Sequence, residues 1–504
     1  MNFSTISFLS LLALSILSTT VTGQKPGGSE PKPNIIFILA DDIGYGDIKA
    51  LNTKSKIATP QLDRLASEGI SFLDAHSNSA VCTPTRYGIL TGRYCYRSEL
   101  KQGVLFGYSP ALIEEGRTTL ASFLDKQGYQ TACIGKWHLG LGWQKKEKDK
   151  PLFVQKENWV TEPSTNCDYT KPVTAGPNSV GFEYSYILPG SLDMAPYVYL
   201  ENQKVTAPVT QQLAGVNTER GVFYREGEMA AGFDINNTLD HFTDKAVEYI
   251  GKAANQDRPF FLYFALTAPH TPWLPAEKYQ GKSGAGRYGD FVMQVDDEVN
   301  RIVEATEKAG ISDNTIIVFT SDNASDWRVT DIEEWKHHAN YIYAGRKSDA
   351  WDGGHHIPFI VKWPARIKPG SQSKEVICTT DWMATCANIL NVSLGNNEGE
   401  DSYSFLPALL GKEKKNTDRA PVIHHSIQGK FAIRKGDWKY IDCRGSGGWT
   451  SPGEETDPLG QLYNMKADPE EQHNLYLKNP KKVEELKKEL GKYETTSSVQ
   501  LKTR

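Results

Sequence analysis

The hydrophobic positions of the chain gather in short continuous runs that are separated by amphipathic stretches. Residues 34–40 (NIIFILA), 260–268 (FFLYFALTA) and 315–320 (TIIVFT) are rich in β-branched and aromatic side chains, and residues 130–134 (QTACI) form a shorter run. Runs of this length and composition are typical of strands that are buried on both faces of a parallel sheet. The pattern therefore predicts four buried strands.

Amphipathic stretches lie between these runs. In residues 60–69 (PQLDRLASEG) and 291–310, apolar side chains recur at helical spacing. Strands that alternate with helices indicate an α/β fold with a large, mainly parallel mixed sheet flanked by helices. Residues 145–180 are polar and without a clear period, so we expect loops there.

The pattern changes near residue 420. Residues 432–441 (AIRKGDWKYI) alternate like a half-exposed antiparallel strand, and residues 444–460 are rich in Gly, Ser and Pro, as in a loop. Asn479-Pro480 is a helix-start signal, and apolar residues follow at helical spacing. We predict a main domain over residues 34–419 and a small C-terminal α+β subdomain with an antiparallel sheet over residues 420–504.

The N-terminus resembles an export signal. Residues 8–17 (FLSLLALSIL) form an apolar run that is short for a bilayer span and is followed by small and polar residues. We predict a signal peptide over residues 1–23 and a flexible lead-in over residues 24–33; the alternative is an N-terminal core helix. The predicted location is periplasmic or secreted, or the secretory pathway or lysosome in a eukaryote, without a membrane anchor.

Charge and cysteine content exclude two classes of protein. A net charge of −5 over 504 residues lacks the basic footprint of a nucleic-acid binder, so a polyanionic substrate would need basic residues concentrated at its site. The chain has seven cysteines and no CxxC spacing, which argues against a zinc knuckle. An odd number also leaves at least one thiol without an internal partner.

Polar residues follow each predicted strand. The four runs lead into Asp41-Asp42, Pro269-His270, Ser321-Asp322-Asn323 and Gly135-Lys136-Trp137-His138. Each Asp taken alone could be a turn or helix cap. However, ligands of open α/β sheets bind beyond the carboxyl ends of the strands, so these four exits predict one shared crevice. Carboxylate and amide oxygens are ligands of Ca²⁺ or Mg²⁺ rather than of zinc.

Residues 82–93 (CTPTRYGILTGR) carry the most specific pattern in the chain. Pro84 and Gly92 frame a short helix with Cys82 at its N-terminal edge. The unpaired N–H groups and positive partial charge of a helix N-terminus suit a bound anion such as a sulfuryl group. Arg86 lies one turn further on and can return to the same end.

This segment resembles the signature C-x-P-x-R followed by L-T-G-R of the formylglycine-dependent (type I) sulfatases of the alkaline-phosphatase superfamily, and an arylsulfatase-like resemblance extends over almost the whole mature chain. It implies a catalytic sulfatase domain over residues 34–419. It also implies that a formylglycine-generating enzyme oxidises Cys82 to formylglycine. The alternative is a buried structural cysteine with a chance flanking pattern.

The resemblance also implies roles for individual residues. The implied calcium ligands are Asp41, Asp42, Asp322 and Asn323 with the modified Cys82, and Mg²⁺ is a possible substitute. The implied catalytic and sulfate-binding residues are Arg86, Lys136 and His138 in GKWHLG, His270 in APHTPW, and Lys347. Lys347 stands in R-K-S rather than the family's G-K-G, and its match depends on Asp352-Gly353-Gly354 five residues later.

The implied reaction is hydrolysis of a sulfate ester. Lys136, His270 and Lys347 would bind the sulfate, Asp322 would take the proton of the attacking hydroxyl, and His270 would protonate the leaving oxygen. His138 would take the proton of the second hydroxyl. The expected substrate is a sulfated carbohydrate. Residues that could line its pocket are His355, His356, His424 and His425, with Trp273 either stacking on a sugar or belonging to the core.

Two other functions fit parts of the sequence. A phosphate ester hydrolase of the same superfamily would typically have Ser or Thr in place of Cys82, and additional His ligands for zinc. A catalytically silent binder of sulfated glycans should have lost some of Cys82, Arg86 and the aspartates, and all are present.

Overall fold

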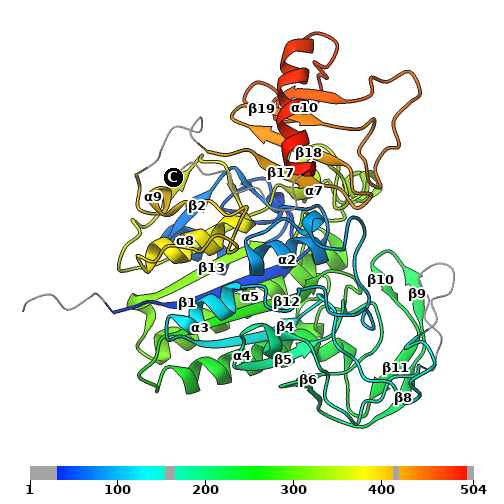
Figure 1. Cartoon of the computed structure of the whole chain (residues 1–504), viewed down its shortest axis with the longest axis vertical. Helices are drawn as coiled ribbons and strands as arrows, with labels where there is room; N and C mark the ends of the chain where they lie inside the picture. Colours follow the sequence, from blue (N-terminus) through cyan, green and yellow to red (C-terminus); the bar gives the residue numbers. More distant parts are fainter. Residues whose placement is uncertain (1–30, 154–164, 413–418, 496–504) are drawn as a thin grey trace, which may run out of the picture. The chain divides into compact units, whose positions relative to one another are not determined.

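The computed structural model describes residues 31–153, 165–412 and 419–495 (Figure 1). Contacts divide the chain into two compact units, residues 1–32 and 33–504, and the fold described here is that of the second. The predicted signal peptide and most of the lead-in lie outside the described residues and remain predictions. Within the described ranges, no helix has the length and apolar character needed to cross a membrane.

A ten-stranded mixed sheet forms the centre of the second unit (Figure 1). Its strands, in spatial order, are β15 (Ser371–Ser373), β2 (Ile70–Phe72), β14 (Phe359–Lys362), β13 (Thr315–Ser321), β1 (Asn34–Asp41), β12 (Phe260–Pro269), β4 (Gln130–Lys136), β5 (Tyr184–Leu188), β6 (Leu200–Glu201) and β7 (Lys204–Val205). Strands β13, β1, β12, β4 and β5 are parallel, whereas β14 and β6 run antiparallel to their neighbours. The four predicted strands and the mainly parallel mixed sheet are confirmed.

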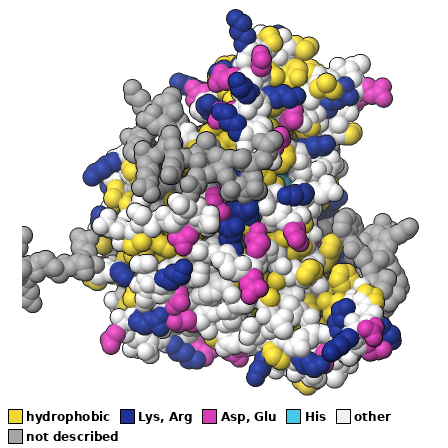
Figure 2. Space-filling model, viewed as in Figure 1, with side chains coloured by type: hydrophobic (Ala, Val, Ile, Leu, Met, Phe, Trp, Pro, Cys, Tyr) yellow, Lys and Arg dark blue, Asp and Glu magenta, His cyan; other side chains and the backbone are white. Residues whose placement is uncertain are grey.

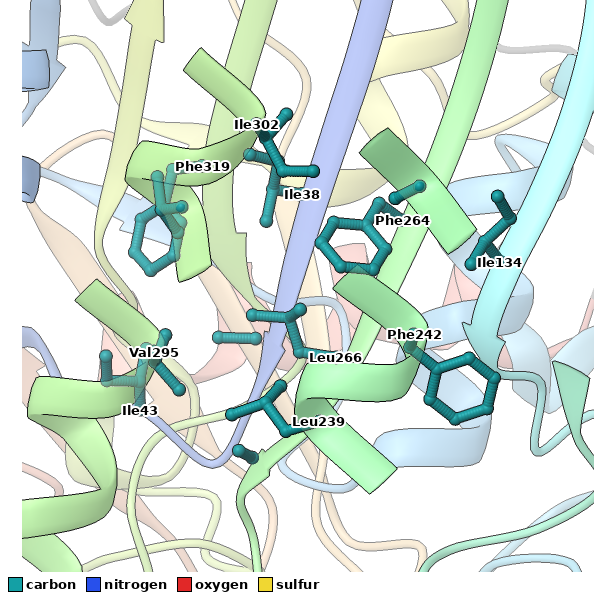
Figure 3. Packing of buried hydrophobic residues seen from close by; sticks show 14 of the residues in the cluster. Ile38, Ile43, Ile134, Leu239, Phe242, Phe264, Leu266, Val295, Ile302 and Phe319 are labelled. Carbon is teal, nitrogen blue, oxygen red and sulfur yellow. The ribbon is translucent and has the colours of Figure 1, made fainter. Parts of the chain in front are cut away.

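Alternate side chains of β1 enter two different cores, because helices cover both faces of the sheet. Ile36, Ile38 and Ala40 pack on the side of α1 (Pro60–Glu68), α4 (Thr238–Ala253) and α5 (Gly286–Lys308), where Figure 3 shows Ile38 among the side chains of this core. The residues between them face α2 (Cys82–Thr91), α3 (Leu120–Lys126) and α8 (Trp382–Ile389). A strand covered on both faces has no solvent side, which explains its unbroken apolar run.

Shorter elements surround the sheet. They are β3 (Ala75–His76) paired with β16 (Ile377–Cys378), the pairs β8 (Val209–Leu213) with β11 (Gly227–Ala230) and β9 (Val216–Glu219) with β10 (Val222–Tyr224), and helices α6 (Val329–Trp335), α7 (Asp352–His355) and α9 (Leu406–Leu409). The predicted helix over residues 291–310 is α5, which begins five residues earlier. The described part of residues 145–180 contains one isolated bridge and the 3-10 turn Pro177–Val180, so its prediction as loops is confirmed.

A four-stranded antiparallel sheet lies near the C-terminus, in the order β17 (Val422–His425), β18 (Phe431–Lys435), β19 (Trp438–Ile441) and β20 (Gln461–Asn464). Helix α10 (Pro480–Thr495) packs on it through Val483, Leu486, Leu490 and Tyr493, as the spacing predicted. The prediction of one strand over residues 432–441 is wrong, since Lys435 pairs with Trp438 across a turn in which Gly436 has a φ of 57°. Gly-Asp is a favoured hairpin loop, and it interrupts the strand without breaking the alternation. A domain boundary at residue 419 stays a prediction.

All seven cysteines lie in the described residues, and all are buried free thiols. The prediction of at least one unpaired thiol is confirmed.

Candidate active site

The polar residues that follow the predicted strands meet at one edge of the sheet. β1 ends at Asp41, and Asp42 follows in the left-handed region with a φ of 72°. Ala40 lies opposite Ser321 on β13, and Asp41 lies opposite Pro269 on β12. Three neighbouring strands therefore deliver their terminal residues to one crevice, as expected for carboxyl ends of parallel strands.

Four oxygen-bearing side chains are clustered there: Asp41, Asp42, Asp322 and Asn323, each at most 4% exposed. Asn323 Nδ2 donates to Asp42 Oδ1 over 2.6 Å, and the Asp42 N–H donates to Asp322 Oδ1 over 3.3 Å. Among the described residues, Asp41 Oδ1 and Asn323 Oδ1 have no hydrogen-bond partner. Burial and the Asp41 charge raise the pKa of Asp322. Unpartnered buried oxygens and mutually repelling carboxylates fit a hard divalent cation such as Ca²⁺ or Mg²⁺.

Buried basic side chains compensate this negative charge. Arg86 donates to Asp322 Oδ2 through Nε (3.0 Å) and Nη2 (2.7 Å), and its Nη1 donates to the Lys136 carbonyl (2.9 Å). Lys136 Nζ donates to Asp41 Oδ2 over 2.7 Å. Burial alone would lower the pKa of Arg86, but Asp322 and Asp41 raise it. Arg86 is thus a permanent positive charge that holds Asp322 in place.

Lys347 lies in the crevice although its local sequence departs from the family pattern. Its Nζ lies 2.7 Å from Asp42 Oδ1 and 2.8 Å from Oδ2. The Lys347 N–H donates to the Ser325 carbonyl (3.1 Å), and the Ser348 N–H donates to the Ala80 carbonyl (2.8 Å). Ser348 has a φ of 86°, a position that usually favours glycine. These bonds fix a turn that directs the lysine inward.

Cys82 is the first residue of α2, a helix whose ten residues are all buried. A ligand atom of Cys82 lies within 4.8 Å of ligand atoms of Asp41 and Asp322. The preceding residue is extended and offers no side-chain cap to the first N–H groups of the helix. Burial raises the pKa of the Cys82 thiol, against the effect of two nearby lysines. The thiol stays protonated at neutral pH and is a poor nucleophile in this form.

His138 faces the same space in a neutral form. Its backbone has a φ of 55°, and its Nε2 lies 2.7 Å from the Leu105 carbonyl. Because a carbonyl only accepts, Nε2 carries the hydrogen and Nδ1, which has no partner in the described residues, carries the lone pair. Burial, Lys136 and Arg86 lower the pKa of His138. His138 Nδ1 is therefore a free proton acceptor.

His270 lines the same cavity with the reverse hydrogen-bonding pattern. Its Nδ1 lies 2.6 Å from the Thr271 carbonyl and 3.3 Å from Ser191 Oγ. Its Nε2 lies 3.8 Å from Asp42 Oδ2. The side chain is 12% exposed. Nδ1 is thus occupied as a donor, and Nε2 is free to exchange a proton with a bound molecule.

Two adjoining cavities open from these residues. One of about 540 Å³ is lined by Cys82 and His138, and one of about 210 Å³ is lined by Asp42 and Ser325. His270 and Lys347 line both. The structure thus brings together the residues proposed from the sequence as catalytic or metal-binding: Asp41, Asp42, Cys82, Arg86, Lys136, His138, His270, Asp322, Asn323 and Lys347.

Three further residues line both cavities and had no motif to reveal them: Asp193, Arg225 and Trp449. Arg225 Nη1 forms an ion pair with the Asp193 carboxylate and also donates to the Asp193 carbonyl over 3.2 Å. Asp193 Oδ1 and Arg225 Nε have no partner in the described residues. Trp449 is 48% exposed. A free acceptor, a free donor and an open indole beside the cavity suit a polar ring such as a sugar.

The proposed pocket histidines His355, His356, His424 and His425 do not line either cavity. His355 stacks on His424 with ring centroids 3.8 Å apart, and both are buried. That prediction is wrong because α7 and β17 direct these side chains into the protein. Trp273 lines the smaller cavity but is only 6% exposed and packs on Tyr288, so it belongs mainly to the core.

Comparison with known proteins agrees with this geometry. The Sulfatase family model matches residues 33–392, and the model described as N-sulphoglucosamine sulphohydrolase, C-terminal, matches residues 347–497. The N-acetylgalactosamine-6-O-sulfatase of Bacteroides thetaiotaomicron is 32% identical over 513 aligned positions, which cover 94% of this chain and 95% of the relative. Human arylsulfatase A is 28% identical, with 88% of this chain and 83% of the relative covered.

Solved structures share the fold. One described under the metabolism of multiple glycosaminoglycans by Bacteroides thetaiotaomicron has a TM-score of 0.79 at 31% identity, covering 92% of this chain and all of the other. Ps i-CgsB in complex with k-i-k-neocarrahexaose has a TM-score of 0.71 at 24% identity, with 94% of each chain covered. Since the Sulfatase model matches more than half of the chain and relatives align over nearly its full length, the chain belongs to the formylglycine-dependent sulfatases of the alkaline-phosphatase superfamily, and it is a sulfatase.

Proposed function

We propose that the protein hydrolyses a sulfate ester on a glycan, with a formylglycine made from Cys82 and a calcium ion. One arrangement carries the proposal. Cys82 is the first residue of a buried helix, and ligand atoms of Cys82, Asp41 and Asp322 lie within 4.8 Å of one another. Cys82 also lines the cavity of 540 Å³. A relative with 32% identity is an N-acetylgalactosamine-6-O-sulfatase. N-acetylgalactosamine 6-sulfate in a glycosaminoglycan is therefore the first ester to test.

A formylglycine at position 82 and a calcium ion would supply part of the chemistry. A hydrated formylglycine would supply two hydroxyls on one carbon as the nucleophile. A calcium ion held by Asp41, Asp42, Asp322 and Asn323 would withdraw charge from the sulfate. Magnesium fits the same oxygen ligands less readily, because it requires a stricter geometry.

The chain's own residues would orient sulfate and move protons. Asp322, held by Arg86 at 2.7 Å, would accept the proton of the attacking hydroxyl. Lys136 and Lys347 each have ammonium protons beyond those shared with their aspartates, and these would stabilise the sulfate oxygens.

The two histidines would act on opposite sides of the reaction. His270 Nε2 would protonate the leaving oxygen, an effect typically of about 10²–10⁴-fold in rate. His138 Nδ1, an acceptor without a partner in the described residues, would take the proton of the second hydroxyl.

The leaving sugar would lie against the three residues that line both cavities. The polar side chains of Asp193 and Arg225 would face the ring substituents, and Trp449 would contact the apolar face of the ring. We further propose that the protein is exported, on the basis of the apolar run at residues 8–17, and that a formylglycine-generating enzyme is its maturation partner.

The test is sulfate release, measured by ion chromatography, from chondroitin sulfates, other sulfated polysaccharides and their oligosaccharides. The protein is co-expressed with a formylglycine-generating enzyme, and conversion of Cys82 is checked by mass spectrometry. We expect release that Cys82→Ala abolishes. Release of phosphate from phosphate esters that survives Cys82→Ala would instead indicate a phosphate ester hydrolase. No release from fully converted protein on any ester would point to a silent glycan binder.

A further inference from the structure

A third and larger cavity, of about 1020 Å³, lies next to the candidate active site. Two short segments, residues 325–327 and 345–347, separate them. Ser325 and Lys347 line the smaller active-site cavity, whereas Trp327 and Gly345 line the large one. Because two residues of chain span at most about 7 Å, the dividing wall is thin. We call the large cavity the lysine groove, after Lys54, Lys56 and Lys336, which line it.

Residues 336–343 form a loop along one side of the lysine groove, and contacts with the segment after β1 hold this loop in place. The Gly46 N–H donates to the Ala339 carbonyl over 2.6 Å, and His337 Nε2 lies 2.8 Å from Asp47 Oδ1. A Cβ on Gly46 would lie 2.0 Å from the His338 carbonyl oxygen, so glycine permits this close approach. The loop therefore packs on the segment that follows β1, which also supplies the carboxylates of the active site.

The same loop holds two residues in an unfavourable backbone conformation. Lys336 has a φ of 51° as the left-handed C-cap of α6, and Tyr341 has a φ of 58° although it is not glycine. Both line the lysine groove, and Asn340 between them bonds the Ser325 main chain in both directions, over 2.9 and 3.0 Å. Non-glycine residues held in this region are concentrated at binding and catalytic sites.

The charges of the lysine groove differ from those of the active site. In the active site, Lys136 and Lys347 are both paired with aspartates at 2.7 Å. Lys54, Lys56 and Lys336 are exposed, and none lies within ion-pair distance of a carboxylate in the described ranges. Acidic and basic side chains are interspersed over the face shown in Figure 2, and the whole chain has a net charge of −5. Glu470 also lines the cavity, so its charged lining residues are three lysines and one glutamate, and the excess of positive charge favours a bound anion.

Aromatic side chains also line the lysine groove. Tyr341 and Tyr343 are half-buried along it, and Ile342 between them is 40% exposed. Tyr343 stacks on His356 with ring centroids 3.8 Å apart, which fixes its plane. Oriented aromatic faces beside cations suit a chain of sugar rings that carries negative charges.

We infer that the lysine groove binds the continuing chain of an anionic polysaccharide whose sulfated residue occupies the active site. The thin wall favours one ligand that spans both cavities, and the unpaired lysines supply the attraction for its charges. This choice of ligand rests on the proposed function. The enzyme should then bind long anionic chains more tightly than single sulfated sugars.

The first test is binding, which does not depend on hydrolysis. The groove variant is Lys54→Gln/Lys56→Gln/Lys336→Gln. The control is Lys204→Gln/Lys478→Gln/Lys481→Gln, which removes the same charge at lysines that are also exposed and lack an ion pair in the described part of the chain. Both are run by affinity electrophoresis in gels that contain chondroitin sulfate. We expect the apparent Kd of the groove variant for chondroitin sulfate to rise about tenfold, the effect expected from the loss of three exposed ion pairs. The control variant should be retarded as strongly as the parent protein.

The second test is kinetic and uses protein converted to formylglycine. On chondroitin sulfate the groove variant should raise KM about tenfold with kcat unchanged, whereas on free N-acetylgalactosamine 6-sulfate both constants should stay the same. Unchanged retardation and KM would overturn the inference, and so would an equal loss on polymer and single sugar. If no ester is cleaved, the proposed function is contradicted. The electrophoresis result still shows whether the lysine groove binds the polysaccharide.

Discussion

At the scale of single residues, the candidate active site contains backbone conformations that most side chains avoid. Asp42, His138 and Ser348 have φ values of 72°, 55° and 86°. Each such residue typically costs about 1–3 kcal/mol and persists only where its surroundings hold it. Asp42 and His138 present functional side chains directly, and Ser348 follows Lys347. The left-handed turns are therefore part of how the site directs these groups inward.

The cluster of oxygen ligands predicts a calcium response at the same scale. Added Ca²⁺ should raise the free energy of unfolding, by about 2.7 kcal/mol at 100 times Kd. Asp41→Asn should abolish this rise, because it removes a charged ligand whose Oδ1 has no partner in the described residues. The measurement is the melting temperature with Ca²⁺ and with a chelator.

Asp193→Asn is the control for calcium, since Asp193 lines the cavity but pairs with Arg225 outside the oxygen cluster. It should keep the full shift in melting temperature. A calcium shift that survives Asp41→Asn would contradict the assigned ligands.

At the scale of elements, helix α2 is a rigid support for Cys82. Its ten residues are all buried, and Gly88 lies against Asn78, which is itself fully buried. Asn78 Nδ2 donates to the Pro84 carbonyl over 3.0 Å, and its Oδ1 accepts from Thr379 over 3.1 Å. Gly92 then ends the helix with a φ of 62°. The glycines of the motif thus serve the packing and termination of the helix that carries Cys82.

This packing predicts that a Gly→Ala substitution changes the free energy of unfolding in opposite directions in helices α2 and α10. A Cβ at Gly88 would lie 2.4 Å from Asn78 Oδ1, so Gly88→Ala should lower the free energy of unfolding by about 1–3 kcal/mol. In α10, a Cβ at Gly491 would meet nothing within 4 Å, and Gly491→Ala should raise it by about 0.5–1 kcal/mol. Urea unfolding measures both. Equal signs for the two variants would show that helix propensity, not packing, governs Gly88.

At the scale of the whole molecule, a buried ionic network joins the C-terminal sheet to the catalytic part. Lys439 on β19 lies 2.6 Å from Asp352 Oδ1 on α7 and 2.8 Å from Glu471 Oε1. Glu471 Oε2 accepts from the Asp352 N–H over 2.6 Å. Asp352 of the main part thus meets a lysine from the C-terminal sheet. Lys439 thus shares its positive charge between two buried carboxylates where the two parts meet.

Removal of the Lys439 ammonium group from this network should destabilise the protein strongly. Lys439→Met leaves Asp352 and Glu471 buried without their counter-charge, and breaking such a pair lowers stability by about 3–5 kcal/mol. Lys435→Met is the control, because Lys435 is 42% exposed and its pair with Glu489 spans 3.9 Å; it should change stability by at most about 1 kcal/mol. Equal melting temperatures for the two variants would contradict this account.

The sequence alone determined the main strands, the α/β architecture and the ten residues gathered in the active site. Each left a local trace: a continuous apolar run marks a strand covered on both faces, and the residues just after parallel strands share one edge of the sheet. The motif of residues 82–93 is also local, since it covers helix α2 and the two residues that follow it. The hairpin at Gly436 was missed because its turn preserves the alternation of the strands on either side.

Only the tertiary structure decided what surrounds the site. Asp193 and Trp449 lie in separate irregular segments, and Arg225 directly follows strand β10. No regular spacing in the sequence relates these three residues. The lysine groove likewise joins residues 54–56 to residues 336–343 through contacts between distant parts of the chain. Recognition of a substrate depends on such long-range contacts, which leave no period or motif in the sequence, whereas strands and catalytic motifs are local and do.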